Sequence, residues 1–188
     1  MQSPANIFIV GGISGSGKGT VCDKLVERHG FVRPVSITTR KPREGERFAA
    51  HYYFVNDELF QWLADTEQLL EHTLVWSGHH YGSLRLSVEQ SLEQGRSVLF
   101  EVNIHGIKQI TAIFPQTKVI FLQAPSEAEQ RLRLELRGTV GEEQDERVAG
   151  AAAELEKAEA LGLKIVTNSD LSQTLEEIEG IFGISKSK

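Results

Sequence analysis

The sequence predicts an α/β fold in which a parallel five-stranded sheet is covered by helices on both faces. Two observations support this prediction: short apolar runs alternate with amphipathic helical patterns, and a glycine-rich turn joins the first run to the first helix. Buried strands of a parallel sheet are apolar along their length because helices cover both of their faces. No repeat, low-complexity tract or linker divides the 188 residues, so we expect a single domain over 1–188.

The first element is the apolar run IFIV at 7–10, which we expect to be a buried strand. After the glycine-rich turn, Val21 and Leu25 belong to one apolar stripe of a helix that we expect to end near Gly30. Residues 36–92 then interrupt the alternation with a mixed segment rich in Arg, Tyr, His and Gly. Because loops and insertions on a scaffold often carry chemistry, we expect this segment to be a functional subdomain.

The alternation of strands and helices resumes in the second half of the chain. Strands are expected at 97–100, 119–122 and 164–167, and helices through Ile107 and Ile110, after Ser126, and through Leu175 and Ile178. Ser126, followed by Glu129 three residues later, has the pattern of a helix N-terminus. The polar, glycine-flanked segment 138–147 is expected to link two helices within a mobile lid.

The whole-chain composition is that of an ordinary globular protein. No apolar run approaches the roughly 20 residues that a membrane span needs, and the first residues lack the pattern of a signal peptide. Cys22 is the single cysteine, which excludes an internal disulfide and is more typical of a small core residue than of a nucleophile. We therefore expect a cytoplasmic protein with no membrane partner.

The charge is unevenly distributed. The net charge of −6 argues against binding to nucleic acid. Bases nevertheless outnumber acids over 31–47, where the sequence contains Arg33, Arg40, Lys41, Arg43 and Arg47. This segment is either a small anion-attracting patch or a solvated loop.

The segment GISGSGK at 12–18 matches the pattern G-x-x-x-x-G-K between the first predicted strand and helix. Its glycines allow backbone N–H groups to surround a phosphate, and Lys18 supplies a cation for the β- and γ-phosphates of ATP. The expected ATP-binding residues of this loop are Gly12, Ser14, Gly15, Ser16, Gly17, Lys18, Gly19 and Thr20. Gly19 stands where a hydroxyl residue usually follows the lysine. In this respect GSGKGT resembles the loop of adenylate kinases, and the resemblance implies Thr20 as the residue that reaches Mg²⁺ or its water shell.

Two further segments, VSITTRKPREGE at 35–46 and HYYFV at 51–55, closely resemble the guanylate kinases, and the similarity continues over nearly the whole chain. This resemblance implies a P-loop nucleoside monophosphate kinase fold and the reaction of ATP with GMP to give ADP and GDP, with Mg²⁺. It also implies three parts: a core at about 1–35, 93–125 and 162–188, a GMP-binding region at about 36–92, and a helical lid at about 126–161.

The same resemblance assigns the GMP site. The GMP phosphate is expected to contact the donors Ser36, Arg40, Arg43, Tyr52 and Tyr81. Glu71 and Ser83 resemble the residues that bind the base, and Glu101 completes the GMP set. A carboxylate can accept both the N1–H and the amino group of guanine, whereas adenine has no N1–H. The alternative interpretation of Glu71 is a solvated surface glutamate.

The remaining implied residues act on the transferred phosphoryl group. Arg137 and Arg147 flank the lid and are expected to close on the phosphates, and Asn168 is expected at the ATP site. Lys18, Arg40, Arg137 and Arg147 are thus the expected catalytic cations, since phosphoryl transfer depends on positioning and electrostatic stabilisation. For the two lid arginines the alternative is an exposed helix charge paired with a glutamate.

One strand end departs from the family pattern Asp-x-Asp-x-Gln-Gly and reads EVNIHG at 101–106. Glu101 keeps a charge on a longer stem, but Asn103 loses one, which we expect to affect rate more than fold. A charge-assisted hydrogen bond contributes about 1.5 to 3 kcal/mol, or roughly a ten- to hundredfold change in rate. This departure leaves open a kinase of the same fold that acts on another phosphorylated acceptor.

A further alternative is a non-catalytic guanylate-kinase-like module that binds proteins, although such a surface does not need the loop lysine or the lid arginines. His79 and His80 are interpreted as loop residues, because neighbouring residues rarely bind one metal together. No coiled-coil or apolar interface pattern indicates an oligomeric state.

Overall fold

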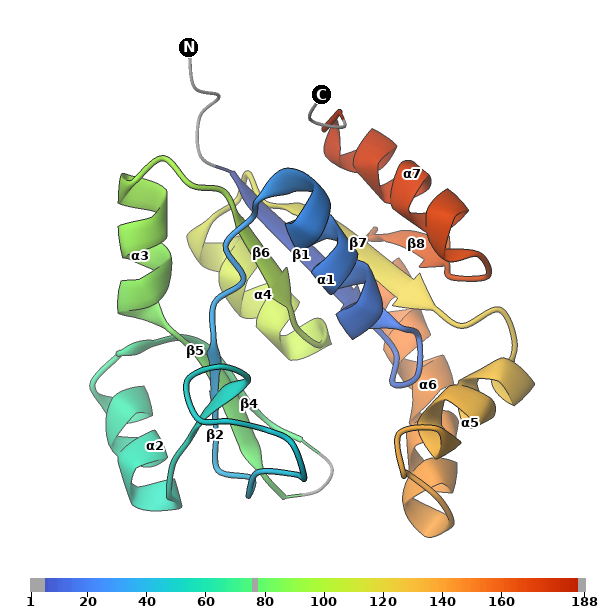
Figure 1. Ribbon diagram of the computed structural model, residues 1–188, viewed down its shortest axis with the longest axis horizontal. Coiled ribbons are helices and arrows are strands. Elements are labelled where there is room, and N and C mark those ends of the chain that lie inside the picture. The colour runs from blue at the N-terminus through green and yellow to red at the C-terminus, as the bar shows by residue number, and fades with distance from the viewer. Residues whose placement is uncertain (1–5, 76–77, 186–188) are drawn as a thin grey trace.

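The structure is a computed structural model that describes residues 6–75 and 78–185 (Figure 1). The predicted α/β class is confirmed: parallel strands form a central sheet, and helices lie on both of its faces. Parts of the predicted core and GMP-binding region, namely 1–5, 76–77 and 186–188, lie outside the described residues. Among the residues that are described, no helix is both long enough and apolar enough to cross a membrane.

The central sheet is built from the apolar runs that were predicted as buried strands. Its strands, in spatial order and all parallel, are β6 (Val98–Glu101), β1 (Ile7–Gly12), β7 (Lys118–Gln123) and β8 (Lys164–Thr167). The expectation of five strands is wrong for the described part of the chain, because at the outer edge of β6 only Val32 forms a bridge, to Val98. Pro34 follows two residues later and has no N–H to donate, so this pairing stops at one residue.

Side-chain alternation along the strands divides the core into two layers. In β1, Phe8 and Val10 belong to one apolar cluster, whereas Ile7 and Ile9 belong to the other, since successive strand side chains face opposite ways. The first face is covered by α1 (Lys18–His29) and α7 (Leu171–Phe182), and the second by α3 (Arg85–Glu93), α4 (Ile104–Ile113) and α6 (Glu142–Ala160) (Figure 1). Cys22 is buried in the first cluster, as predicted for a core residue.

The helix ends follow the predicted chemistry, with one correction. Gly30 ends α1 in a left-handed conformation, and Ser126 Oγ accepts a hydrogen bond from the Glu129 N–H at 3.2 Å, where α5 (Glu127–Glu135) begins. The predicted link 138–147 is too long, because α6 already begins at Glu142. The acidic residues in the first turn of α6 favour this early start through their interaction with the helix dipole.

A second sheet carries the segment that interrupts the alternation. Its strands, in spatial order, are β3 (Tyr52–Phe54), β2 (Ser36–Thr38), β5 (His80–Leu84) and β4 (Leu69–Leu74). Ile37 and Phe60 belong to a small apolar cluster between this sheet and α2 (Asp57–Asp65). Of the two histidines expected in a loop, His80 instead begins β5 and stacks on the Phe60 ring at 5.0 Å, because strand alternation turns it toward α2. Figure 1 shows this sheet on one side of the molecule and α5 on the other.

Candidate active site

The predicted phosphate-binding loop connects β1 to α1 and requires glycine at several positions, including 15 and 17. Gly15 (φ +78°) and Gly17 (φ +90°) have left-handed backbones that residues with a Cβ rarely adopt. At Gly17 there is also no room, since a Cβ would lie 2.4 Å from Asn168 Nδ2. Gly17 is the N-cap of α1, so the unpaired N–H groups of the first helical turn lie at this loop.

Lys18 reaches back across the loop. Its Nζ donates to the carbonyl oxygens of Gly12 at 2.6 Å and Ile13 at 2.8 Å. Burial lowers the pKa of Lys18, and the charge of Glu101 partly opposes this shift. In the same loop, Ser16 Oγ is buried and has no hydrogen-bond partner among the described residues. An unpaired buried hydroxyl is costly unless a ligand satisfies it, and a phosphate oxygen has the right chemistry to do so.

Three side chains support the loop from outside. Asn168 Nδ2 donates to the Ser16 carbonyl at 2.8 Å, and Arg133 donates to the carbonyls of Ser16 at 3.2 Å and Asn168 at 2.9 Å. Gln130 Nε2 donates to the Ser14 carbonyl at 2.9 Å. Asn168 was predicted at the ATP site, but Arg133 and Gln130 were not. Their spacing places both on one face of α5, a signal too common on helices to have selected them.

One face of the second sheet gathers the predicted acceptor residues. Ser36 pairs with Tyr52 and with Ser83, and Ser83 pairs with Glu71, so these side chains share a face. Tyr81 lies two residues before Ser83 and is on the same face. The opposite face packs against α2. Strand alternation thus separates a polar face from an apolar one in a region where the sequence pattern had looked irregular.

Arg40 is held in a fixed orientation at the end of this polar face. Its Nε donates to the Tyr81 hydroxyl at 2.9 Å, and its two terminal nitrogens donate to the Glu46 carboxylate at 2.9 Å each. The guanidinium carbon lies 5.4 Å from the Tyr52 ring centroid. The bidentate pair fixes the plane of the guanidinium. Arg43 is exposed, and the structure does not bring its side chain into an ion pair within the described residues.

Glu71 is buried, with 4% of its surface exposed, so the alternative of a solvated surface glutamate is wrong. Ser83 Oγ donates to Glu71 Oε1 at 2.7 Å. Burial raises the pKa of Glu71 to about 7, and the bond from Ser83 partly opposes this. The second oxygen, Oε2, lies 3.0 Å from the position that a Cβ on Gly106 of α4 would take. A carboxyl bonded by one hydroxyl keeps acceptor capacity for a ligand.

A bulge in β4 places this carboxyl. Leu69 pairs with Leu84 and Glu71 with Ser83, so Leu70 is the extra residue. Leu69 packs in the cluster against α2, whereas Leu70 joins the main core. In a regular strand, residues two apart such as Leu69 and Glu71 would face the same way. Because of the bulge, Leu69 faces α2 and the Glu71 carboxyl faces the opposite side of the sheet, although the two residues are close in sequence.

The polar residues at the end of β6 and just after it have separate roles. A Cβ on Gly19 would lie 3.8 and 3.9 Å from the two carboxylate oxygens of Glu101, which places Glu101 beside the phosphate-binding loop. Asn103 Oδ1 accepts from the N–H groups of His105 at 3.0 Å and Gly106 at 3.1 Å, and thereby caps α4. The His105 side chain is exposed. The two residues that depart from the family pattern therefore differ in role. Glu101 is a charged group beside the phosphate-binding loop, and Asn103 is a neutral helix cap.

The two predicted lid arginines differ in their contacts. Arg147 of α6 donates to Ser14 Oγ at 3.1 Å and pairs with Glu143 at 2.7 Å. Arg137 is exposed and forms no ion pair with any described residue, but its charge helps to lower the pKa of Lys18. For Arg147, pairing with a neighbouring glutamate and contact with the phosphate-binding loop therefore occur together.

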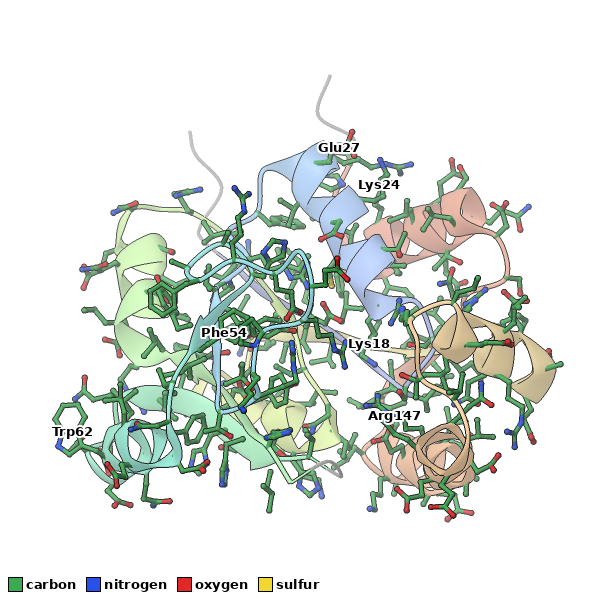
Figure 2. The ribbon with its side chains drawn as sticks, turned by 60° about the horizontal axis from the view of Figure 1, so that its bottom comes forward. Lys18, Lys24, Glu27, Phe54, Trp62 and Arg147 are labelled. Carbon is green, nitrogen blue, oxygen red and sulfur yellow. The ribbon has the colours of Figure 1, made fainter. Side chains whose placement is uncertain are left out.

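Three parts of the molecule converge at the phosphate-binding loop. Figure 2 shows Lys18 between Phe54 of the second sheet and Arg147 of the lid helix. Glu101 comes from the central sheet, and Thr20, the candidate Mg²⁺ ligand, is exposed in the first turn of α1. A loop with a half-buried lysine, a second sheet with a polar face and a helix pair that contributes Arg147 define a P-loop nucleoside monophosphate kinase fold.

Comparison with known proteins narrows this class. The family model for guanylate kinase matches residues 4–183, and the chain belongs to the guanylate kinase family. It is 38% identical to a guanylate kinase of Trichodesmium erythraeum, over 93% of this chain and 94% of that protein. It is 36% identical to one of Desulfitobacterium hafniense, over 96% and 90%.

Solved structures agree with this assignment. A crystal structure of guanylate kinase from Anaplasma phagocytophilum is similar with a TM-score of 0.78 and 30% identity, over 100% of this chain and 89% of that one. An unliganded sugar kinase from Janibacter sp. has a TM-score of 0.54 and 15% identity, which shows a likeness of fold alone.

Proposed function

We propose that this protein is a guanylate kinase, which transfers the γ-phosphoryl group of ATP to GMP to give ADP and GDP. The observation that supports this most strongly is the buried Glu71, bonded by Ser83 on the same sheet face as Tyr81, the hydroxyl partner of Arg40. A carboxylate with free acceptor capacity suits the N1–H and amino group of guanine. Family membership adds independent support.

Two groups of residues in the acceptor site would bind the two ends of GMP, the base and the phosphate. Glu71 and Ser83 would bind the base. Arg40 and Tyr81 would bind the phosphate, together with the donors Ser36, Tyr52 and Arg43, and the Glu101 carboxylate would complete the GMP site beside them. Arg40 and Tyr81 are already bonded to each other at 2.9 Å, so their donors are oriented before the ligand arrives.

The donor site would hold ATP at the loop, residues Gly12 to Thr20, with Asn168 at its outer wall. Lys18 would exchange its two carbonyl partners for phosphate oxygens, and the Ser16 hydroxyl would gain a partner. Arg137 and Arg147 would then close from the lid. Several cations around the transferred group stabilise the charge that develops on it, and closure excludes water, so that ATP is not hydrolysed.

Mg²⁺ would accompany ATP, and the residues present fit it. Mg²⁺ in kinases is bound largely by phosphates and water, with one or two protein oxygens. The Thr20 hydroxyl and the Glu101 carboxylate provide such oxygens, and the described residues contain no cluster of three or more potential metal ligands that would suggest another kind of centre. When bound, the ion would neutralise charge on the β- and γ-phosphates.

The wider organisation follows from the same proposal. The core at 1–35, 93–125 and 162–188 would carry the ATP loop, the region 36–92 would bind GMP, and the lid at 126–161 would move. We infer a cytoplasmic location, and the proposed reaction needs neither nucleic acid nor membrane as a partner.

The proposal is tested by a coupled assay of ADP release with ATP, Mg²⁺ and, separately, GMP, dGMP, AMP, CMP and UMP. We expect kcat/KM for GMP to exceed that for AMP by at least about 10⁴, because AMP leaves the buried Glu71 without its N1–H partner. Preference for AMP or a pyrimidine nucleotide would mean another acceptor. Folded protein with no turnover on any acceptor would favour the protein-binding module.

A further inference from the structure

Arg33 connects the central sheet to the phosphate-binding helix, and no role in the proposed reaction has been assigned to it. One terminal nitrogen of its guanidinium pairs with Asp23 on α1, and the other pairs with Glu101 at the end of β6. Arg33 follows Val32, the residue that bridges to β6, so its backbone is anchored at the edge of the central sheet. An arginine that uses both terminal nitrogens in this way fixes the direction of each carboxylate.

The carboxylate that Arg33 holds lies at a point where donor and acceptor sites meet. The oxygens of Glu101 are 3.8 and 3.9 Å from the position of a Cβ on Gly19, one residue after Lys18. Burial lowers the pKa of Lys18 and the charge of Glu101 opposes this; burial raises the pKa of Tyr52 in the second sheet, and the charge of Glu101 adds to that rise. A displacement of this one carboxylate would therefore change the field at both sites.

A carboxylate on a flexible stem beside a lysine tends to pair with that lysine. In this structure Lys18 donates to two backbone carbonyls, and no ion pair joins it to Glu101 within the described residues. Glu101 pairs instead with Arg33. The pair is partly exposed, with 36% of the Arg33 side chain and 25% of the Glu101 side chain accessible. Because exposed pairs contribute little to stability, orientation is the larger effect.

We propose that Arg33 is a positioning residue, which holds the Glu101 carboxylate beside Gly19 and away from Lys18, so that Lys18 remains available for phosphate. This inference rests on the proposed phosphoryl transfer. It also accounts for the glutamate at 101: the longer stem reaches a guanidinium outside the loop.

The kinetic test is a double-mutant cycle in the ADP-release assay. Arg33→Met is expected to lower kcat about tenfold while the KM for GMP changes less than about threefold, since Lys18 acts on the transferred group. In the Glu101→Gln background, Arg33→Met should cause no further loss, because no carboxylate remains to be positioned. Arg33→Lys should recover part of the loss. Additive effects of the two substitutions would contradict the proposal.

Two controls separate position from charge and from stability. Lys24→Met also removes one cation from this side of the molecule, but Lys24 pairs with Glu27 and not with Glu101. Asp23→Asn removes the second carboxylate that pairs with Arg33. The Asp23 side chain is 70% exposed. Both variants should keep kcat within about twofold of the parent. A loss in Lys24→Met equal to that in Arg33→Met would show a general charge effect and overturn the inference.

A structural test does not depend on turnover. Crystal structures of the parent chain and of Arg33→Met should show the Glu101 carboxylate moved from Gly19 toward Lys18 in the variant. An unmoved carboxylate overturns the inference even if the parent is an active guanylate kinase. Conversely, a parent with no turnover on GMP overturns the proposed function, while the two structures still decide the role of Arg33.

Discussion

At the scale of single residues, the titration of Glu71 affects the stability of the protein and, under the proposed function, its affinity for GMP. Its carboxyl is buried among β4, β5 and the start of α4, and it has one hydroxyl donor, from Ser83. Burial raises its pKa from 4.5 to about 7. Between these two pH values, the folded protein retains a proton that the unfolded chain has released. Stability therefore falls as pH rises through this window, by on the order of 3 kcal/mol in total.

The same titration predicts a pH dependence of GMP binding. If the ionised carboxylate binds guanine, the ionised fraction rises roughly tenfold between pH 6 and pH 8, so the Kd for GMP should fall by about tenfold over that range. Isothermal titration calorimetry with GMP at the two pH values measures this. Glu71→Gln should bind GMP about 10 to 100 times more weakly and lose this part of the dependence.

Titration of the GMP phosphate also contributes to such a profile, and the Glu71→Gln variant retains that contribution. The difference between parent and variant is therefore the decisive quantity. The variant should also be more stable than the parent at pH 8, because it buries no charge there, and lose this advantage near pH 5. Identical pH profiles for parent and variant would show that Glu71 does not bind the base.

At the scale of the elements, the start of α4 explains why asparagine at 103 is compatible with this site. Asn103 Oδ1 caps the helix through two N–H groups, and Gly106 in the same turn lies against Glu71. An aspartate would also cap the helix, but it would place a second anion near the buried Glu71 and raise the pKa of Glu71 further. The neutral cap therefore preserves the helix start without this repulsion.

A matched pair of caps tests the link between α4 and the acceptor site. Asn103→Ala and Asn56→Ala each remove an asparagine cap, the second at α2, where Asn56 Oδ1 accepts from the Leu59 N–H at 2.9 Å. Each should cost about 1 kcal/mol of unfolding free energy, measured by urea denaturation. Only Asn103→Ala should also raise the KM for GMP, by roughly tenfold, because its helix start supports Glu71.

Two outcomes would contradict the proposed link between α4 and the acceptor site. If both variants lose stability while the KM for GMP is unchanged in each, the first turn of α4 does not position the acceptor carboxyl. A rise in KM with Asn56→Ala would indicate that α2 transmits its loss through the apolar cluster at Phe60 and Ile37.

The elements also show how far the sequence could predict this molecule. Strands such as β8 and the helix starts at Ser126 and Gly17 follow from apolar runs and capping residues, because those signals are local. The second sheet could not be derived in this way. Three of its elements are short or bulged, and the bulge at Leu70 depends on packing against two different clusters.

The same limit applies to the candidate site. The phosphate-binding loop is a contiguous motif, and the sequence therefore located it together with Lys18. Arg33, Arg133 and Gln130 act through contacts with residues distant in the chain, such as Glu101, Ser16 and Ser14. Partners of this kind are set by tertiary packing, and a single sequence contains no local pattern that marks them.

At the scale of the whole molecule, the proposed lid is anchored at both ends, and a short link joins its two helices. Gln130 and Arg133 tie α5 to the phosphate-binding loop, and Ala151 and Ala158 anchor α6 in the core. The connection between them contains Gly138 (φ +78°). This short link and the adjoining helix ends, which carry Arg137 and Arg147, are therefore the part of the lid best placed to move.

Gly138→Ala tests that role against a control with the same backbone chemistry. Gly138 and Gly30 both have positive φ, and a Cβ at either would meet nothing within 4 Å, so alanine introduces strain without a clash. Each substitution should cost about 1 kcal/mol and lower Tm by roughly 2 to 4 °C. Only Gly138→Ala should also lower kcat severalfold and change the KM for ATP, because it distorts the end of α5 beside Arg137.

Calorimetric scans and the ADP-release assay on the two variants provide the comparison. Gly30 ends α1 far from the lid, with its N–H bonded to the Val26 carbonyl at 2.9 Å, so its kinetic constants should match those of the parent. Equal kinetic losses in both variants would trace the effect to global stability. Unchanged kinetics in Gly138→Ala, with the expected drop in Tm, would show that the conformation at Gly138 does not govern closure of the lid arginines.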